Sequence, residues 1–320
     1  MNQRRPVRVE TPQRFQLLSA GTTETCAITE RGGGIVCWGG PYPGTMPRTV
    51  LADREYSTIA LHSNACAIST DGNGWCWGSN GSGQLGSGSA SGEVAATPQP
   101  LAGGRKWRVI EPSPGAFACG LTDAGVAMCW GSNASGQLGT GAEQGNRTPA
   151  LIAESPIYQS LAVGTEHACG LGQDAKAWCW GRGEDGALGD GRRATSRVPV
   201  RVAGQHRWTQ LTAGFGFTCG LDDAGRAWCW GNGQYGVLGT GNTRGSDIPV
   251  AVGGTLRFTT LSAGQTHVCG VANAQLYCWG DNADGQLGLA RARTCRTVLG
   301  PGRTDVRQCA LSPSRIQEPR

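Results

Sequence analysis

Hydrophobic and polar positions alternate along this chain in short runs, not in long helical stretches. The runs are rich in Val, Ile, Thr and aromatic residues, and glycine or proline closes nearly every one of them. This pattern is typical of half-buried β-strands. No segment keeps a helical apolar period between caps, and 53 glycines in 320 residues would penalise long helices. The sequence therefore predicts an all-β protein.

One unit of these strands recurs six times. Each copy carries two cysteines, and the second is always followed by Trp-Gly. The first cysteines are Cys26, Cys66, Cys119, Cys169, Cys219 and Cys269, so the last three intervals are fifty residues each. The second cysteines are Cys37, Cys76, Cys129, Cys179, Cys229 and Cys278. An aromatic residue precedes the first cysteine in every copy, at Phe15, Tyr56, Trp107, Tyr158, Trp208 and Phe258.

Copies of this size stack or close because none can bury its apolar face alone. A β repeat of about 40–50 residues has the length of a propeller blade, which is a four-stranded antiparallel sheet. Each copy also contains a proline-led β segment such as Pro199-Val-Arg-Val, and a glycine-framed turn. The turn reads Gly-Gln-Leu-Gly at Gly83–Gly86, Gly136–Gly139 and Gly285–Gly288. We expect residues 1–320 to form one six-bladed β-propeller of four-stranded antiparallel blades.

The residues that carry this pattern also resemble a known family. The order Ala/Val-Gly-x-x-His-x-Cys-Gly-Leu, then Cys-Trp-Gly, Gly-Gln-Leu-Gly and Pro-Val-x-Val is similar to the regulator-of-chromosome-condensation repeat. The resemblance covers roughly residues 6–290 and implies a β-propeller. It says less about function, because one propeller scaffold serves many purposes. The family includes a nuclear guanine-nucleotide exchange factor and secreted bacterial propellers that inhibit β-lactamases, and this chain is closest in style to the secreted members.

The first copy departs from the family pattern. After Cys37-Trp-Gly it reads Gly40-Pro-Tyr-Pro-Gly and lacks Gly-Gln-Leu-Gly. We expect the rim of the first blade to be shorter or differently shaped.

The spacing of the cysteines predicts disulfides within hairpins. Between Cys119 and Cys129 the midpoint falls in the turn Asp123-Ala-Gly, so a hairpin folding there sets the two cysteines opposite each other. Opposed residues of antiparallel strands have Cα atoms about 4.5–5.5 Å apart, a separation that a disulfide can span. The same symmetry pairs the cysteines of the other five copies, and Cys295 and Cys309 then pair by elimination. Buried free thiols, and less readily zinc binding, are the alternatives.

Fourteen paired cysteines would indicate an oxidising compartment, so we expect the protein outside the cytoplasm: extracellular, periplasmic or at the cell surface. The first residues lack the apolar core of a signal peptide, and no run of apolar residues is long enough to span a membrane. A secreted protein would then be represented by its mature or excised form. Proline-led strands occur at both ends, Pro6-Val-Arg-Val and Pro313-Ser-Arg-Ile. Either the C-terminal one completes the last blade, or the natural protein continues into further repeats.

The net charge of +5 comes from the two ends. Residues 1–14 hold four arginines against one acidic residue, and residues 289–320 hold seven against two. The body between them is slightly acidic, so we do not expect the folded body to bind nucleic acid. We interpret 289–320 as an Arg-rich C-terminal loop with a closing strand, more typical of a solvated tail than of a site for an acidic partner.

Catalytic and metal-binding patterns are absent from the sequence. It has no nucleophile elbow, zinc-protease motif or P-loop, and Asp281-Asn-Ala-Asp-Gly lacks the spacing of a calcium loop. We therefore predict no catalysis, cofactor or metal.

A candidate binding surface emerges once the aromatic residues of the repeat are set aside. The off-pattern residues are Tyr42, Phe117, Phe215, Phe217 and Tyr235. Aromatic residues in loops are enriched at binding hot spots, and propeller loops gather at one end of the central channel. The predicted binding set is Phe117, Phe215, Phe217 and Tyr235, with Glu166, His167 and His267 on neighbouring loops. The alternatives are that the rings fill loop cores and that the histidines make structural hydrogen bonds.

We interpret the protein as a non-catalytic propeller that binds another protein or an extracellular ligand. Three other readings stay open: an enzyme inhibitor, a rigid spacer or adhesion module cut from a longer repeat protein, and a guanine-nucleotide exchange factor. The exchange-factor reading is disfavoured because disulfides do not suit a nuclear compartment. No blade shows an obvious long inserted wedge in the sequence either.

Overall fold

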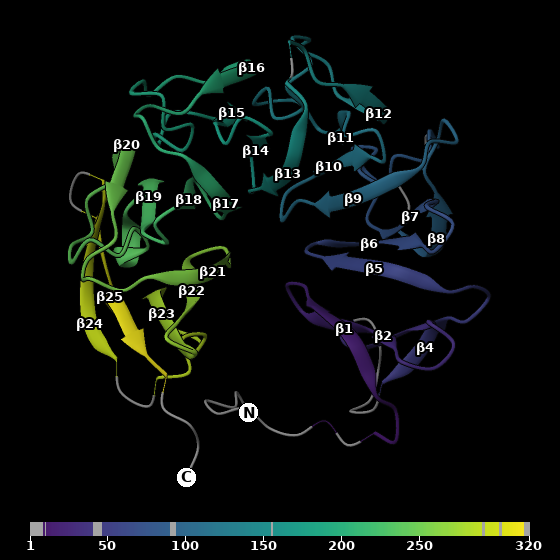
Figure 1. Cartoon of the computed structure of the whole chain (residues 1–320), viewed down its shortest axis with the longest axis horizontal. Helices are drawn as coiled ribbons and strands as arrows, with labels where there is room; N and C mark the ends of the chain where they lie inside the picture. Colours follow the sequence, from purple (N-terminus) through teal and green to yellow (C-terminus); the bar gives the residue numbers. More distant parts are fainter. Residues whose placement is uncertain are drawn as a thin grey trace. The chain divides into compact units, whose positions relative to one another are not determined.

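The computed structural model describes residues 9, 11–40, 47–89, 94–154, 156–289, 292–300 and 303–316. These residues form six antiparallel sheets, each a propeller blade (Figure 1). The predicted all-β, six-bladed fold is confirmed. By density of contacts the chain divides into two compact units, Arg8–Val163 and Gly164–Arg320, which we describe separately. No described helix is long and apolar enough to cross a membrane.

Each sheet of the first unit is a meander in which consecutive strands pair. The first sheet contains β1 (Phe15–Ala20), β2 (Glu24–Thr29), β3 (Ile35–Gly39) and β4 (Arg48–Leu51). The second contains β5 (Tyr56–Leu61), β6 (Asn64–Ser69), β7 (Gly74–Gly78) and β8 (Ala95–Pro100). The third contains β9 (Trp107–Pro112), β10 (Phe117–Thr122), β11 (Ala127–Gly131) and β12 (Asn146–Leu151).

The fourth sheet has the order β13-β14-β15-β16 and contains β13 (Tyr158–Val163), β14 (His167–Gly172), β15 (Ala177–Gly181) and β16 (Ser196–Arg201). The fifth contains β17 (Trp208–Ala213), β18 (Phe217–Asp222), β19 (Ala227–Gly231) and β20 (Ser246–Ala251), with the 3₁₀ turn η1 (Gln234–Gly236) between the last two. The sixth has five strands in the order β21-β22-β23-β25-β24. They are β21 (Phe258–Ala263), β22 (His267–Ala272), β23 (Gln275–Asp281), β24 (Arg293–Gly300) and β25 (Arg303–Arg315).

The second and third strands of every blade are joined by a disulfide in the predicted register. Cys119 lies opposite Cys129, and the other five blades repeat this pairing. The Cα atoms of these pairs are 4.0–4.1 Å apart. Cys295 is joined to Cys309, which leaves no free cysteine in the chain. Each hairpin is therefore closed covalently by its own two cysteines.

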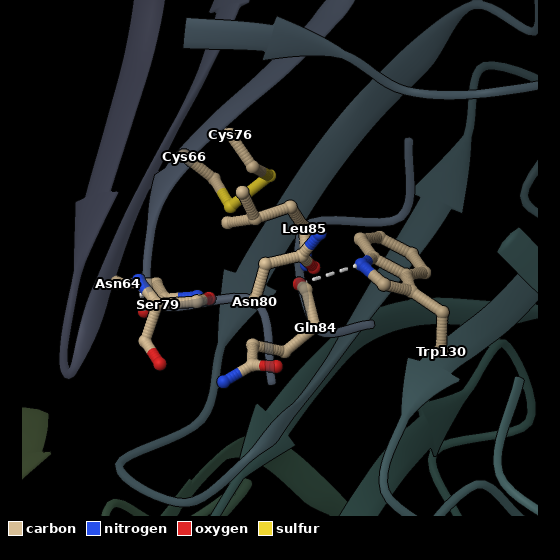
Figure 2. Close-up of a disulfide and its surroundings, with 8 residues drawn as sticks. All are labelled: Asn64, Cys66, Cys76, Ser79, Asn80, Gln84, Leu85 and Trp130. Carbon is tan, nitrogen blue, oxygen red and sulfur yellow. Dashed lines mark hydrogen bonds between the residues drawn. A yellow bond between two sulfur atoms is a disulfide. The ribbon is translucent and has the colours of Figure 1, made fainter. Parts of the chain in front are cut away.

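The tryptophan of Cys-Trp-Gly fastens its blade to the glycine-framed turn of the blade before it. Trp130 donates its indole N–H to the carbonyl of Gln84 at 3.0 Å (Figure 2). Within the second unit, Trp230 donates to Ala187 at 2.9 Å and Trp279 to Val237 at 2.9 Å. The acceptor is in each case the second residue of the turn. These three pairs of neighbouring blades are therefore joined by a buried hydrogen bond at the same position of the repeat.

The leucine of the same turn fills the space beside the disulfide. Leu85 packs with Cys66, Cys76 and Trp130 in one buried cluster (Figure 2). Its backbone N–H donates to the side chain of Asn80 at 3.2 Å. Asn282 accepts the same bond from Leu287 at 3.0 Å, so the loop from Asp281 to Gly285 is a structural turn of the repeat.

The close approach of the tryptophan ring requires a glycine at the last position of the turn. Gly189 has φ of +66°, and a Cβ there would lie 2.6 Å from the indole nitrogen of Trp230. Gly239 has φ of +67° and faces Trp279 in the same way. A side chain at either position would both strain the backbone and strike the tryptophan that holds the next blade.

The C-terminal region differs from the expected loop. β24 and β25 form a two-stranded ribbon that the Cys295–Cys309 disulfide braces. The last residues of β25 pair with β23, so Pro313-Ser-Arg-Ile supplies the fourth strand of the sixth blade. The ribbon is thus an insertion between the third and fourth strands of that blade. The sequence did not reveal it because its arginines and glycines are typical of a solvated loop.

Three features of the sequence interpretation fall outside the described residues. They are most of the opening strand Pro6-Val-Arg-Val, the altered rim of the first blade after Gly40, and Tyr42.

We predict that Gly189→Ala destabilises the protein more than Gly104→Ala. Gly104 has φ of +59° but nothing within 4 Å of its Cβ position, so it reports backbone strain alone. That strain costs about 1–2 kcal/mol, and overpacking against Trp230 adds roughly 1–3 kcal/mol. Urea unfolding of the two variants measures the difference. Equal losses would show that the tryptophan contact tolerates the extra methyl group.

Candidate functional site

The turns between the first and second strands of each blade lie beside the loops that follow the third strands. In the second unit, the backbone N–H of Arg182 donates to Glu166 at 2.9 Å, and that of Asn232 donates to Gly216 at 2.8 Å. Successive turns are linked as well, because Thr165 donates its N–H to Gly214 at 3.3 Å. Both kinds of loop therefore form one surface on this side of the blades.

Phe215 is the aromatic residue of the predicted set that this surface exposes. Its exposed fraction is 45%, whereas Phe217 two residues later is 1% exposed. Its backbone N–H donates to Gln265 in the next turn at 2.9 Å. Gly214, just before Phe215, has no room for a side chain, and Gly216, just after it, has φ of +69°. The ring is therefore presented by a tightly held backbone.

Acidic side chains occur on the loops next to the turn that carries Phe215. Arg182 donates to Glu166 at 2.7 Å and to Glu184 at 3.0 Å, and all three side chains are at least 38% exposed. A carboxylate oxygen of Asp185 lies 3.1 Å from the Cβ position of Gly216, next to Phe215. We call Glu166, Arg182, Glu184, Asp185 and Phe215 the loop face. It combines three acidic groups, one arginine and one exposed aromatic ring.

Phe117 and Phe217 are buried side chains, unlike Phe215. Each is 1% exposed, and Phe217 belongs to the core cluster shared by the fifth and sixth blades. Phe117 begins β10, in the first unit. The burial of both rings agrees with the alternative that off-pattern aromatics fill loop cores.

His167 is buried and makes a hydrogen bond between blades. Its Nε2 lies 2.9 Å from the hydroxyl of Thr218, which itself donates to the carbonyl of Ala187 at 3.1 Å. Because the hydroxyl hydrogen is used in that way, His167 is the donor to Thr218. Burial lowers the pKa of His167 to about 4, so the ring is neutral at physiological pH. His267 is half-buried, and burial also lowers its pKa.

Tyr235 is 7% exposed and holds the C-terminal ribbon. Its hydroxyl donates to Asp305 at 2.9 Å, and its backbone N–H donates to the hydroxyl of Thr297 at 3.1 Å. The guanidinium carbon of Arg307 lies 4.9 Å from the ring centroid. The ring packs with Cys295 and Cys309 in a small cluster. Its polar group is thus satisfied within the protein.

The structure adds residues that sequence analysis did not select. Asp185 and Glu184 belong to the loop face but lie in a glycine-rich turn, where acidic residues are common. Glu111 on β9 is a second case, because burial raises its pKa to about 7. Nothing in the sequence marks Glu111, since only the packing of the first strand against its neighbours makes it partly buried.

We predict that His167→Phe reduces acid sensitivity. The pKa of His167 is lower in the folded protein than its ordinary value of 6.5, so stability falls as pH drops from 6.5 towards 4. At pH 5 the expected loss is about 2 kcal/mol relative to pH 7. Phenylalanine already occupies this repeat position as Phe117 and Phe217, which makes it the conservative replacement.

The measurement is urea unfolding of both proteins at pH 7 and pH 5. The comparison is made between variant and wild type because Glu111 acts in the opposite direction. Its raised pKa makes stability fall as pH rises from 4.5 towards 7 in both proteins. An unchanged pH dependence in the variant would contradict the assignment to His167.

The repeats match a known family of repeat sequences. The profile of the regulator of chromosome condensation (RCC1) repeat matches residues 125–171, 174–221 and 224–271, and a second profile of that repeat matches 208–237. The human E3 ubiquitin-protein ligase HERC2 is 33% identical over 106 residues, which are 32% of this chain and 2% of HERC2. The mitochondrial RCC1 domain-containing protein RUG3 of Arabidopsis thaliana is 28% identical over 159 residues, 43% of this chain and 35% of RUG3. The match therefore spans only a part of each relative.

Solved structures agree with the fold. Human WBSCR16 has a TM-score of 0.85 at 18% identity, with 99% of this chain and 86% of that protein covered. Prp20p of Saccharomyces cerevisiae, whose structure was described with its binding to Gsp1p and histones, has a TM-score of 0.78 at 18% identity over 94% of this chain and 76% of Prp20p. Identities this low concern the fold alone. The resemblance seen in the sequence is confirmed: residues 125–271 are a run of regulator-of-chromosome-condensation repeats.

Proposed function

We propose that residues 1–320 act as a single propeller domain that binds another protein through the loop face, without catalysis. The observation that carries this proposal is Phe215, a large aromatic ring that is 45% exposed on a tightly held turn. Aromatic side chains that are rigid before binding lose little entropy in a complex, and they are enriched among hot spots. Propellers of this repeat are also known to bind proteins, as Prp20p binds Gsp1p.

The charge around Phe215 supports a partner with a basic rim. Glu166 and Glu184 share Arg182, and Asp185 has no ion pair within the described residues. A net negative surface around an apolar centre favours positively charged groups on the partner, mainly by steering its approach. The loop face is therefore suited to an apolar pocket flanked by Lys or Arg.

We also propose that the protein works in an oxidising compartment: extracellular, periplasmic or at the cell surface. The support is that all fourteen cysteines are placed for disulfides, six of the pairs in equivalent hairpins. Such a density of disulfides is rare where thiols are kept reduced.

We predict that Phe215→Ala weakens partner binding without affecting stability. Truncating a central hot spot costs about 2 kcal/mol or more of binding free energy, roughly thirtyfold in affinity. Leu276→Ala is the matched control, because Leu276 is 44% exposed and lies at the other end of its blade. The partner is isolated by cross-linking to immobilised protein in the native source, and affinities are then measured by calorimetry. Equal effects of both variants, or unfolding of the Phe215 variant, would contradict the proposal.

A thiol count on native material tests the compartment. The protein is denatured without reductant, alkylated and weighed as an intact chain. We expect no alkylated cysteine, because every thiol is paired. Fourteen alkylated cysteines would place the working protein in a reducing compartment. The cysteines would then serve only as packing residues.

A further inference from the structure

The outer edges of the blades are protected in a regular way, with one exception. An edge strand presents unpaired backbone N–H and C=O groups, and proline protects it because proline has no N–H to offer. Proline occurs within the outer strands β8, β12, β16 and β20, at Pro98, Pro149, Pro199 and Pro249. Pro313 occupies the outer part of β25. The proline that leads the repeat segment therefore serves as an edge guard.

β24 contains no such protective proline. It is eight residues long, contains no proline, and pairs only with β25 among the described residues. β4 also lacks an internal proline, but it has four residues and follows Pro47 directly. A short edge offers few groups for pairing, whereas eight residues can hold a complete additional strand. Among the described outer strands, β24 is thus the long one that no proline protects.

The ribbon behind this edge is held rigidly. Cys295 is joined to Cys309 across the two strands, and the hydroxyl of Tyr235 binds Asp305 on β25. Thr297 on β24 accepts the backbone N–H of Tyr235. The edge is therefore ordered before any partner arrives, which lowers the entropy that pairing must overcome.

The charges on β24 decide which strand fits. Arg293 and Arg296 are exposed and stand three residues apart, so their side chains lie on opposite faces of the ribbon. Two copies of β24 pairing edge to edge would bring like charges together, which is destabilising. A strand with acidic residues at matching positions would instead form opposite-charge pairs on both faces.

We propose that the free edge of β24 binds an extended acidic segment of another protein by strand addition. Main-chain hydrogen bonds supply the affinity, and Arg293 and Arg296 select carboxylates three residues apart on the incoming strand. This site is distinct from the loop face and does not depend on it.

The test uses the full oxidised chain and a fluorescent peptide of about eight residues, mainly threonine and valine, with two glutamates three positions apart. We expect saturable binding in fluorescence anisotropy with a Kd below about 1 mM. Hydrogen exchange should slow at backbone amides of β24 when the peptide is bound. A peptide with glutamine in place of glutamate should bind more weakly, and one with a central proline should not bind.

Two double variants separate strand addition from simple charge attraction. Arg293→Glu with Arg296→Glu should weaken binding about tenfold or more. Arg197→Glu with Arg201→Glu on β16 changes the same charge on an outer strand that Pro199 guards, and it should have little effect. Phe215→Ala should leave peptide binding unchanged, so failure here and failure of the loop face are told apart.

Four results would overturn the proposal: no saturable binding, no protection of β24 amides, equal loss in both double variants, or equal binding of the glutamine peptide. A wild-type dimer in sedimentation that the Arg293/Arg296 variant alters would assign the edge to a second copy of the chain. Unfolding curves of the variants confirm that the reversed charges have not disturbed the ribbon.

Discussion

The bond between a buried tryptophan and the turn of the preceding blade is the interaction on which this structure depends. Trp130, Trp230 and Trp279 each donate to the second residue of a glycine-framed turn, and the last glycine of the turn lies against the indole ring. A single contact thus explains why Trp-Gly and the Gly-x-Leu-Gly turn occur together in the repeat. Strand propensity alone would produce the sheets, but this bond fixes how one sheet packs on the next.

The fold could be predicted because the repeat encodes it many times. Six cysteine pairs about ten residues apart, each centred on a turn, allow one register only, and the structure has it. The aromatic residue that opens the first strand is predicted equally well: Tyr158 and Trp208 are both buried. A signal that recurs at fixed spacing survives local irregularities, because no single copy has to carry it.

The candidate site could be predicted only in part, because binding residues are the ones that depart from the repeat. Phe215 and Phe217 look alike in sequence, yet Phe215 lies in the turn between β17 and β18 and is exposed, whereas Phe217 begins β18 and is buried in the core. Tyr235 depends on a ribbon whose strands begin about sixty residues later, a contact that no local pattern reveals. The two ends of β25, one on the ribbon and one in the blade, likewise cannot be separated from sequence, because no glycine or proline marks the point where its partner changes from β24 to β23.

The placement of the disulfides has a mechanical consequence. All seven close loops of 9 to 14 residues within a single blade. The disulfides therefore stabilise each sheet but transmit no force from one sheet to the next. We expect a pulled chain to give way at the contacts between blades before any hairpin opens. A chain cut by a protease between blades would be held together by packing and hydrogen bonds, without a covalent link. Each blade is thus closed covalently, whereas the contacts between blades are noncovalent.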